Sequence, residues 1–293
     1  AAEAPTVLTA SAHAGAAHAV DCNPNKAHQA LTAAVDGLIK CWHADSGDLV
    51  RTLTHHAGWV TDLLYVPKAR ALFACSADGC VSIWTSKGEN IGSERPGAGD
   101  HTGAGRAVMG PLSCLAHDAR RNLLLAGGFG VVWAFALDVD TADRARDQRL
   151  QMLRLVGMLS DDHGRPPHAD GPVRKIISTD SGKVFTVGSD RQIRVWDTLH
   201  KVSGDAAVAA RRRKSGYGES PLECVSTVSN CHSGAISACT YDPDNNWIIT
   251  GSFDRRVRVW ASDSKQILQV GGFSDTLTGL CYVADTKMIW MCS

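Results

Sequence analysis

The sequence lacks an excess of charge of either sign, with 30 Lys and Arg against 30 Asp and Glu in 293 residues. Without a basic excess there is no general electrostatic attraction for nucleic acid, so we expect no nucleic-acid partner. No apolar run approaches the roughly 20 residues that span a bilayer, and no basic segment precedes an apolar one at the N-terminus. The composition predicts an intracellular, cytoplasmic protein with no membrane partner.

The sequence also lacks any C-x-x-C pair, although it contains ten Cys residues. This absence argues against zinc or thioredoxin-like chemistry. Most of the cysteines stand in apolar, β-rich runs, such as Cys41 in I-K-C-W and Cys75 in L-F-A-C-S. We therefore expect buried thiols in a reducing compartment, with neither a metal nor a cofactor.

What the sequence does contain is a repeat. Four times, an Asp stands six residues ahead of a Trp, and a His-containing loop stands 28 or 29 residues ahead of that Trp. Between the His and the Asp lie two alternating apolar runs separated by a turn, and another short run follows each Trp. Each unit therefore predicts four short strands. The Asp–Trp pairs are Asp36 and Trp42, Asp78 and Trp84, Asp190 and Trp196, and Asp254 and Trp260.

This pattern resembles the WD-repeat family of β-propellers, whose repeat of about 40–45 residues forms one four-stranded blade. The His loops read H-A-G at His13 and His56, H-A-D-G at His168 and H-S-G at His232. A literal W-D occurs only at Trp196-Asp197. The resemblance covers nearly the whole chain and implies an all-β propeller.

We expect five full blades and part of a sixth. The boundaries are an outer strand of a preceding or closing blade at 1–12, blade 1 at 13–54, blade 2 at 55–95, blade 3 at 96–160, blade 4 at 161–229, blade 5 at 230–271 and a partial blade 6 at 272–293. Blade 3 is degenerate: aligning Gly130 with Gly37 puts Phe129 at the Asp position and Phe135 at the Trp position. The missing initiator Met and the incomplete last blade predict a longer chain, whose remainder completes a ring of seven blades.

In the family that the chain resembles, the His, the turn Asp, a strand hydroxyl and the Trp form a hydrogen-bonded network. The hydroxyl position, four before the Asp, is Thr in three blades and Ala74 in blade 2. A catalytic triad is the competing interpretation, but a triad occurs once, whereas this set recurs, so we expect architecture and no enzyme. The network residues are His13, Thr32, Asp36 and Trp42; His56, Asp78 and Trp84; His168, Thr186, Asp190 and Trp196; and His232, Thr250, Asp254 and Trp260.

Candidate partner-binding residues lie beside these turns, because the resemblance places binding positions on the face of the Asp turns and His loops. The residues just before the turn Asp are Val35, Ala77, Ser189 and Phe253, and Trp59 stands three after His56. Trp59 and Phe253 are the strongest candidates for a protein partner. The alternative is that each packs against a neighbouring blade.

Three further stretches carry competing interpretations. The insertion at 199–221 contains Arg211, Arg212, Arg213, Lys214 and Ser215, which fits a phosphorylation site, an import signal, a contact for an acidic partner such as tubulin, or a solvated loop. The charged insertion 138–149 and the Gly-rich stretch 97–105 predict a solvated loop and a linker.

Metal binding by His55 and His56, or by His163 with Asp161 and Asp162, lacks a second ligand cluster.

Three function classes follow. The first is a non-enzymatic scaffold that binds other proteins in a multi-subunit assembly, and within it the stretch S-D-T-L-T-G-L-C-Y-V resembles ciliary and axonemal WD-repeat proteins, with tubulin or axonemal partners. The second is a ubiquitin-ligase substrate receptor, although Leu199 stands where the W-D-x-R motif of that group has Arg. The third is a propeller hydrolase, which requires carboxylates or metal ligands converging near the axis.

Overall fold

The fold is described from a computed structural model that covers residues 12–22, 28–96, 110–138, 152–160, 166–168, 170–197, 220–261 and 263–293. These residues form strands and turns, and none of them belongs to a helix that is long and apolar enough to cross a membrane. The chain divides into two compact units: Ala1–Arg95 with Asp138–Met152, and Pro96–Leu137 with Leu153–Ser293.

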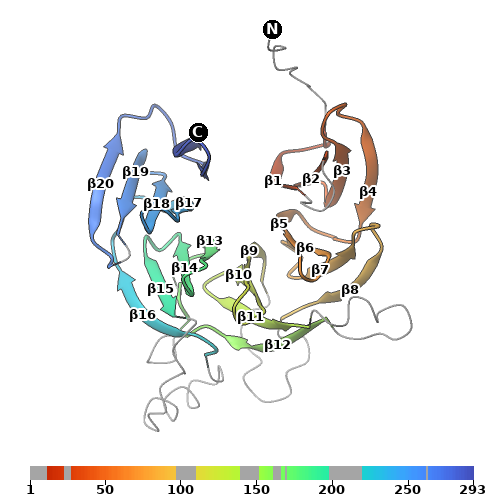
Figure 1. The fold of residues 1–293 in the computed structure, drawn as a ribbon, viewed down its shortest axis with the longest axis horizontal. Helices are drawn as coiled ribbons and strands as arrows, with labels where there is room; N and C mark the ends of the chain where they lie inside the picture. Colours follow the sequence, from red (N-terminus) through yellow and green to blue (C-terminus); the bar gives the residue numbers. More distant parts are fainter. Residues whose placement is uncertain are drawn as a thin grey trace. The chain divides into compact units, whose positions relative to one another are not determined.

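Unit 1 contains two four-stranded antiparallel sheets whose strands follow chain order (Figure 1). Each strand pairs antiparallel with the next strand in the chain, as the alternating apolar runs predict. The first sheet, blade 1, is β1 (Ala17–Cys22), β2 (Gln29–Ala34), β3 (Leu38–His43) and β4 (Leu49–Thr54). The second, blade 2, is β5 (Val60–Val66), β6 (Ala71–Ser76), β7 (Val81–Thr85) and β8 (Asn90–Glu94).

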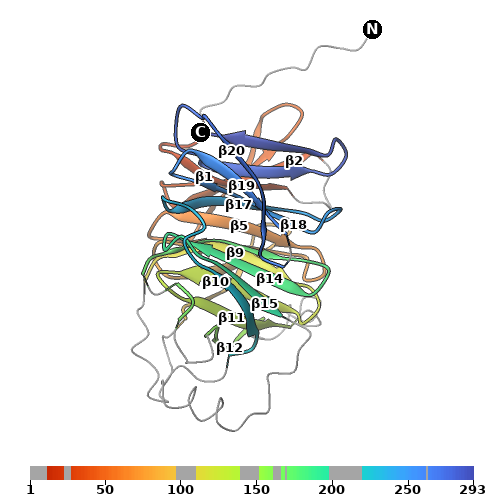
Figure 2. The same ribbon diagram turned by 90° about the vertical axis from the view of Figure 1, so that its left-hand side faces the viewer.

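Unit 2 contains three more such sheets and one β-hairpin, and consecutive sheets lie side by side (Figures 1 and 2). Blade 3 is β9 (Leu112–Asp118), β10 (Leu123–Gly128), β11 (Val132–Leu137) and β12 (Leu153–Met158). Blade 4 is β13 (Val173–Ser178), β14 (Lys183–Gly188), β15 (Ile193–Asp197) and β16 (Glu223–Val228). Blade 5 is β17 (Ile236–Asp242), β18 (Trp247–Ser252), β19 (Arg256–Trp260) and β20 (Gln266–Gly271), and the hairpin is β21 (Gly279–Val283) with β22 (Met288–Cys292).

The core of each unit lies between neighbouring sheets. In unit 1, Ile39 and Leu31 of blade 1 share an apolar cluster with Leu72 and Trp84 of blade 2. In unit 2, Trp196 is fully buried in a cluster that blades 3 and 4 build together. Because both faces of the second strand are covered, β6 and β10 are buried along their whole length, whereas β20 is exposed along its whole length.

Hydroxyl groups also join neighbouring sheets in unit 2. Ser113, at a bulge in β9, donates to the carbonyl of Val173 in blade 4 and to Gly127 in its own sheet. Ser237, at the matching bulge in β17, donates to Leu277, which precedes the hairpin, and to Gly251. The extra residue of each bulge therefore turns a side chain toward the next sheet.

Blade 3 has the register that the alignment of Gly130 with Gly37 predicts. Phe135 lies opposite Leu124 on the neighbouring strand, as Trp196 lies opposite Val184 in blade 4. Phe135 is buried and fills the Trp position, but it has no N–H to donate, and Ala126 stands where blade 4 has a hydroxyl. Blade 3 therefore packs like the other blades without the polar network.

The cysteines are less uniformly buried than their apolar surroundings predict. All ten are free; five are buried, two are half-buried, and Cys22, Cys281 and Cys292 are exposed. Exposure follows position, since Cys22 ends β1 and the other two lie in the two-stranded hairpin. Burial raises the pKa of Cys231 and of Cys239 to about 12, so these two thiols stay protonated and pack as small apolar groups.

Candidate partner-binding turns

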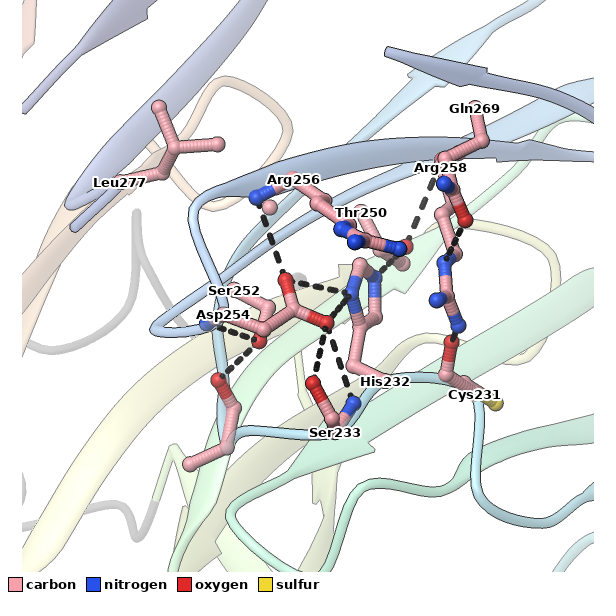
Figure 3. Close-up of polar contacts among 12 residues, drawn as sticks. Cys231, His232, Ser233, Thr250, Ser252, Asp254, Arg256, Arg258, Gln269 and Leu277 are labelled. Atoms are coloured by element: carbon pink, nitrogen blue, oxygen red, sulfur yellow. Dashed lines mark hydrogen bonds and ion pairs between the residues drawn. The ribbon is translucent and has the colours of Figure 1, made fainter. Parts of the chain in front are cut away.

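In blade 5 the His loop, the Asp turn and two strands meet in one hydrogen-bonded network (Figure 3). His232 Nδ1 lies 3.0 Å from Asp254 Oδ2, and His232 Nε2 lies 2.8 Å from the Thr250 hydroxyl. Trp260 Nε1 donates to the same hydroxyl over 3.0 Å. Asp254 also accepts from the backbone N–H groups of Ser233 and Arg256, so its carboxylate holds the His loop against the turn.

Blades 1 and 4 repeat this arrangement. In blade 4, His168 Nδ1 lies 2.8 Å from Asp190, and both His168 Nε2 and Trp196 Nε1 lie 3.0 Å from the Thr186 hydroxyl. The corresponding blade 1 distances are 2.9 Å from His13 to Asp36, 2.7 Å from His13 to Thr32 and 2.7 Å from Trp42 to Thr32. The structure thus brings the predicted four residues together in three blades.

Blade 2 obtains its hydroxyl from a different strand. His56 Nε2 lies 2.7 Å from Ser82 Oγ, Trp84 Nε1 donates to the same oxygen over 2.8 Å, and His56 Nδ1 contacts Asp78 at 2.9 Å. Ser82 lies directly opposite Ala74, the position that carries Thr in the other three blades. The interpretation of blade 2 as only a partial network is therefore wrong. The missed signal was a Ser two residues before the Trp.

The hydrogen bonds of the network are structural. A carboxylate only accepts hydrogen bonds, so the Asp fixes the neutral His with its proton on Nδ1, and Nε2 then accepts from the hydroxyl. The hydroxyl in turn accepts from the Trp N–H. Ser82, Thr186 and Thr250 are all fully buried, so a substrate carbonyl has no route to these oxygens. The same residue types that would make a triad are here packed inside a sheet.

Burial sets the titration of these groups. It lowers the pKa of His56, His168 and His232 below the ordinary value for His, and the neighbouring Asp only partly offsets that effect. Burial acts to raise the pKa of Asp78 and Asp254, but hydrogen bonds from backbone N–H groups and from the His outweigh it, and each pKa lies below the ordinary value. The folded state therefore favours neutral His beside ionised Asp.

A pH dependence of stability follows from these directions. Below pH 6.5, the ordinary pKa of His, the unfolded chain binds protons that the folded His residues resist, so the free energy of unfolding should fall as the pH is lowered. A second loss should begin below 3.8, the ordinary pKa of Asp, because the folded carboxyls resist protonation. Urea unfolding measured between pH 8 and pH 5 tests the first step. Equal stability at both ends would contradict the assignment of neutral His.

The Asp turns and the His loops are joined by a backbone hydrogen bond beside each network. The N–H of Ala77 donates to the carbonyl of Trp59 over 2.8 Å, and the N–H of Phe253 donates to the carbonyl of Ala235 over 3.0 Å. The backbone of both candidate residues is thereby fixed while the side chains face outward. Trp59 is 56% exposed and Phe253 is 46% exposed, so neither is packed away under a neighbouring sheet.

The other predicted turn residues are less prominent. Val35, Ala77 and Ser189 are half-buried; Val35 lies against Gly15, and Ser189 Oγ accepts from Arg174 Nε over 2.8 Å. His18 was not predicted, yet its ring stacks on Trp59 with the centroids 5.9 Å apart. In unit 1, Trp59 and His18 therefore form an exposed aromatic pair. Such a pair leaves no sequence signal, because the two residues come from different blades.

Some predicted sites lie outside the described residues. These are the basic stretch Arg211–Ser215, the position of Leu199, the Gly-rich stretch 97–105, the segment 161–165 with His163, and the first eleven residues. Within the part of the chain that is described, no three His, Cys, Asp or Glu side chains gather as metal ligands. The Asp turns with their His loops are thus the candidate site that the structure describes.

Comparison with known protein families identifies the repeat of this chain. The family model for the WD domain, G-beta repeat, matches residues 47–85, 163–197 and 222–261. These ranges contain the Asp–Trp units of blades 2, 4 and 5. The chain contains three WD repeats. Its four-stranded sheets accordingly have the form of WD-repeat propeller blades, and the family model matches neither blade 3 nor most of blade 1.

Three known proteins are each similar to part of this chain. The chain is 22% identical over 254 residues to a striatin homolog from Dictyostelium discoideum, covering 82% of this chain and 26% of that protein. It is 23% identical to guanine nucleotide-binding protein subunit beta-1 from Nicotiana tabacum, over 88% of this chain and 59% of that protein. To the COMPASS component SWD3 from Saccharomyces cerevisiae it is 32% identical over 84 residues, 26% of this chain and 27% of that protein. The chain thus spans less than two thirds of each.

Proposed function

We propose that this WD-repeat chain is a non-enzymatic scaffold that binds other proteins through its Asp turns and His loops. The observation that carries the proposal is the exposure of Trp59 and Phe253 on backbone that is fixed by hydrogen bonds. Rigid aromatic groups dominate the binding energy of protein interfaces, because they bury a large area at a low cost in conformational entropy. The names of two relatives, a subunit and a component, are consistent with membership of a complex.

Site-directed photo-crosslinking tests this proposal. A benzoylphenylalanine in place of Trp59 or of Phe253, in a chain expressed in its native cells, should form covalent adducts with a partner protein. Val225 on β16 is 48% exposed and provides a matched control position away from the turns. Adducts at the turn positions and none at Val225 support the proposal. Equal labelling at all three positions, or none at the turns, would refute it.

Truncating either aromatic side chain to Ala measures its contribution to partner binding. Trp59→Ala and Phe253→Ala should each weaken capture of the crosslinked partner of their own unit by about tenfold or more, since a central aromatic residue contributes 2 kcal/mol or more. Because both side chains are exposed, neither change should lower the midpoint of urea unfolding. Weaker capture together with reduced stability would point to a structural role instead.

The cellular setting that we propose is ciliary or cytoskeletal, with tubulin or an axonemal protein as partner. Its support is the resemblance of the stretch from Ser274 to Val283 to axonemal WD-repeat proteins. Identification of the crosslinked partner by mass spectrometry tests this setting separately. A nuclear or ribosomal partner would overturn it while leaving the scaffold proposal intact.

A further inference from the structure

The Asp turns of unit 2 differ in charge from those of unit 1. The residue after the turn position, which is Phe129 in blade 3 and Asp in the other four blades, has a positive φ in all five. It is Gly37, Gly79 and Gly130 in blades 1, 2 and 3, as that backbone conformation favours. Blades 4 and 5 place arginine there instead, Arg191 with φ 64° and Arg255 with φ 61°. Two neighbouring blades therefore carry a long cation at a position where three others carry no side chain.

Some of the arginines near these turns have internal roles. Arg258 donates to the carbonyl of Cys231, the residue before His232, and to Gln269 Oε1 over 2.9 Å (Figure 3). Lys40, at the same position in blade 1, donates to the carbonyl of Ala12 before His13. Arg194 lies 3.9 Å from Asp190. In blades 1, 4 and 5, the cationic residue two before the Trp thus contacts the His loop or the turn.

Three arginines remain outside this internal bonding: Arg191, Arg255 and Arg256, which we call the arginine rim. All three are exposed, and among the described residues their guanidinium groups have no hydrogen-bond or ion-pair partner. The carboxylates beside them, Asp190 and Asp254, are occupied by His and backbone N–H groups. The rim guanidinium groups therefore make no ion pair with these carboxylates, and the two negative charges offset only part of the three positive charges of the rim.

An exposed apolar side chain stands on the same turn as two of the rim arginines. Phe253 stands two residues before Arg255 and is exposed, and Arg191 is linked to blade 5 because its carbonyl accepts from the N–H of Cys231 over 2.9 Å. On the blade 4 side, Arg174 keeps a further guanidinium beside Ser189 at 2.8 Å. Guanidinium groups bind carboxylates in paired hydrogen bonds, and an exposed Phe accepts an apolar side chain.

We propose that the arginine rim binds an acidic segment of a partner protein, which places carboxylates on Arg191, Arg255 and Arg256 and an apolar side chain on Phe253. This inference rests on the proposed scaffold function and names the chemistry of its unit 2 partner. A protein segment is favoured over nucleic acid because the chain has no net basic charge to collect a phosphate backbone. Unit 1, whose turns carry glycine beside Trp59, is expected to bind a different, less charged surface.

The turn geometry supplies a variant that removes charge without straining the fold. Arg191→Gly and Arg255→Gly restore the residue that blades 1, 2 and 3 use at this positive φ, and Arg256→Gln removes the third charge. The triple variant should keep the urea midpoint of the native chain. A control with the same charge change is Arg51→Gln, Lys68→Gln and Arg154→Gln, at three exposed positions away from the rim.

Fluorescence anisotropy with defined probes provides the readout. The probes are a fluorescein-labelled peptide Glu-Glu-Phe-Glu-Glu, its Gln-Gln-Phe-Gln-Gln counterpart, and a duplex DNA of mixed sequence. We expect the Glu peptide to bind the native chain, its Kd to rise about tenfold in the rim variant, and its Kd to stay within about twofold in the control. Binding should also weaken as salt is raised.

Three results would overturn the proposal: equal affinity for the Gln peptide, no difference between the rim variant and the control, or tighter binding of DNA than of the Glu peptide. Crosslinking separates this failure from that of the scaffold function. If the rim variant still yields the native adduct at Phe253, the charge assignment is wrong and the scaffold stands. If the native chain yields no adduct at all, the scaffold function is wrong, whatever the peptides show.

Discussion

Replacing Asp254 with Ala is expected to lower the free energy of unfolding by about 3 kcal/mol. The Asp254 side chain is only 5% exposed and the His232 side chain is fully buried. Removing the carboxylate leaves the His232 Nδ1–H and the N–H groups of Ser233 and Arg256 without their acceptor. Urea unfolding at pH 7.5, followed by Trp fluorescence, measures the loss.

Asp263→Ala is the matched control for Asp254. Asp263 pairs with Lys265 at 3.1 Å, but both side chains are more than half exposed, so this ion pair contributes at most about 1 kcal/mol. A loss in D254A no larger than in D263A would show that the Asp of the turn is not structural. The interpretation of the His–Asp sets as architecture would then fail.

Ser82→Ala should destabilise blade 2 by about 2 kcal/mol, because it leaves the Trp84 N–H and His56 Nε2 buried without their shared partner. The other blades indicate which second substitution should restore the lost stability. Ala74 lies opposite Ser82 and occupies the position of Thr32, Thr186 and Thr250, so Ala74→Ser in the S82A background should recover more than half of the lost stability.

The rescue has its own control. In the native chain Ala74→Ser adds a buried hydroxyl beside one that is already satisfied, so it should be neutral or destabilising. Urea midpoints of the four chains form a double-mutant cycle with a coupling energy of about 1 kcal/mol or more. If the two changes are additive, the hydroxyl of blade 2 does not do the work of the strand Thr in the other blades.

Much of this fold was predictable because the repeat constrains it several times over. The spacing of Asp and Trp places a turn, a strand and a buried indole in each unit, and the register of Phe135 opposite Leu124 could be inferred from Gly130 alone. The same spacing joined each His to its Asp. These contacts could be predicted because they lie within one blade, where the pairing of the strands fixes which residues are neighbours.

What could not be predicted depends on contacts across the ladder or between blades. Ser82 replaces a Thr from the facing strand, and only the strand pairing reveals that the two positions converge on one point. The stacking of His18 on Trp59 joins residues from two sheets, and Arg191 and Arg255 read as ordinary turn residues until their φ angles are compared with those of the glycines. A one-dimensional pattern carries no information on such distances.

The hydrogen bond from Phe253 to Ala235, repeated from Ala77 to Trp59, from Val35 to Ala16 and from Ser189 to Pro172, uses only backbone atoms. Among the side chains beside it, those of Trp59 and Phe253 are exposed and are free to change. One scaffold can therefore acquire new specificity by single substitutions at these positions, with little loss of stability. The blades thus share one backbone connection at this turn and differ in the side chain that it presents.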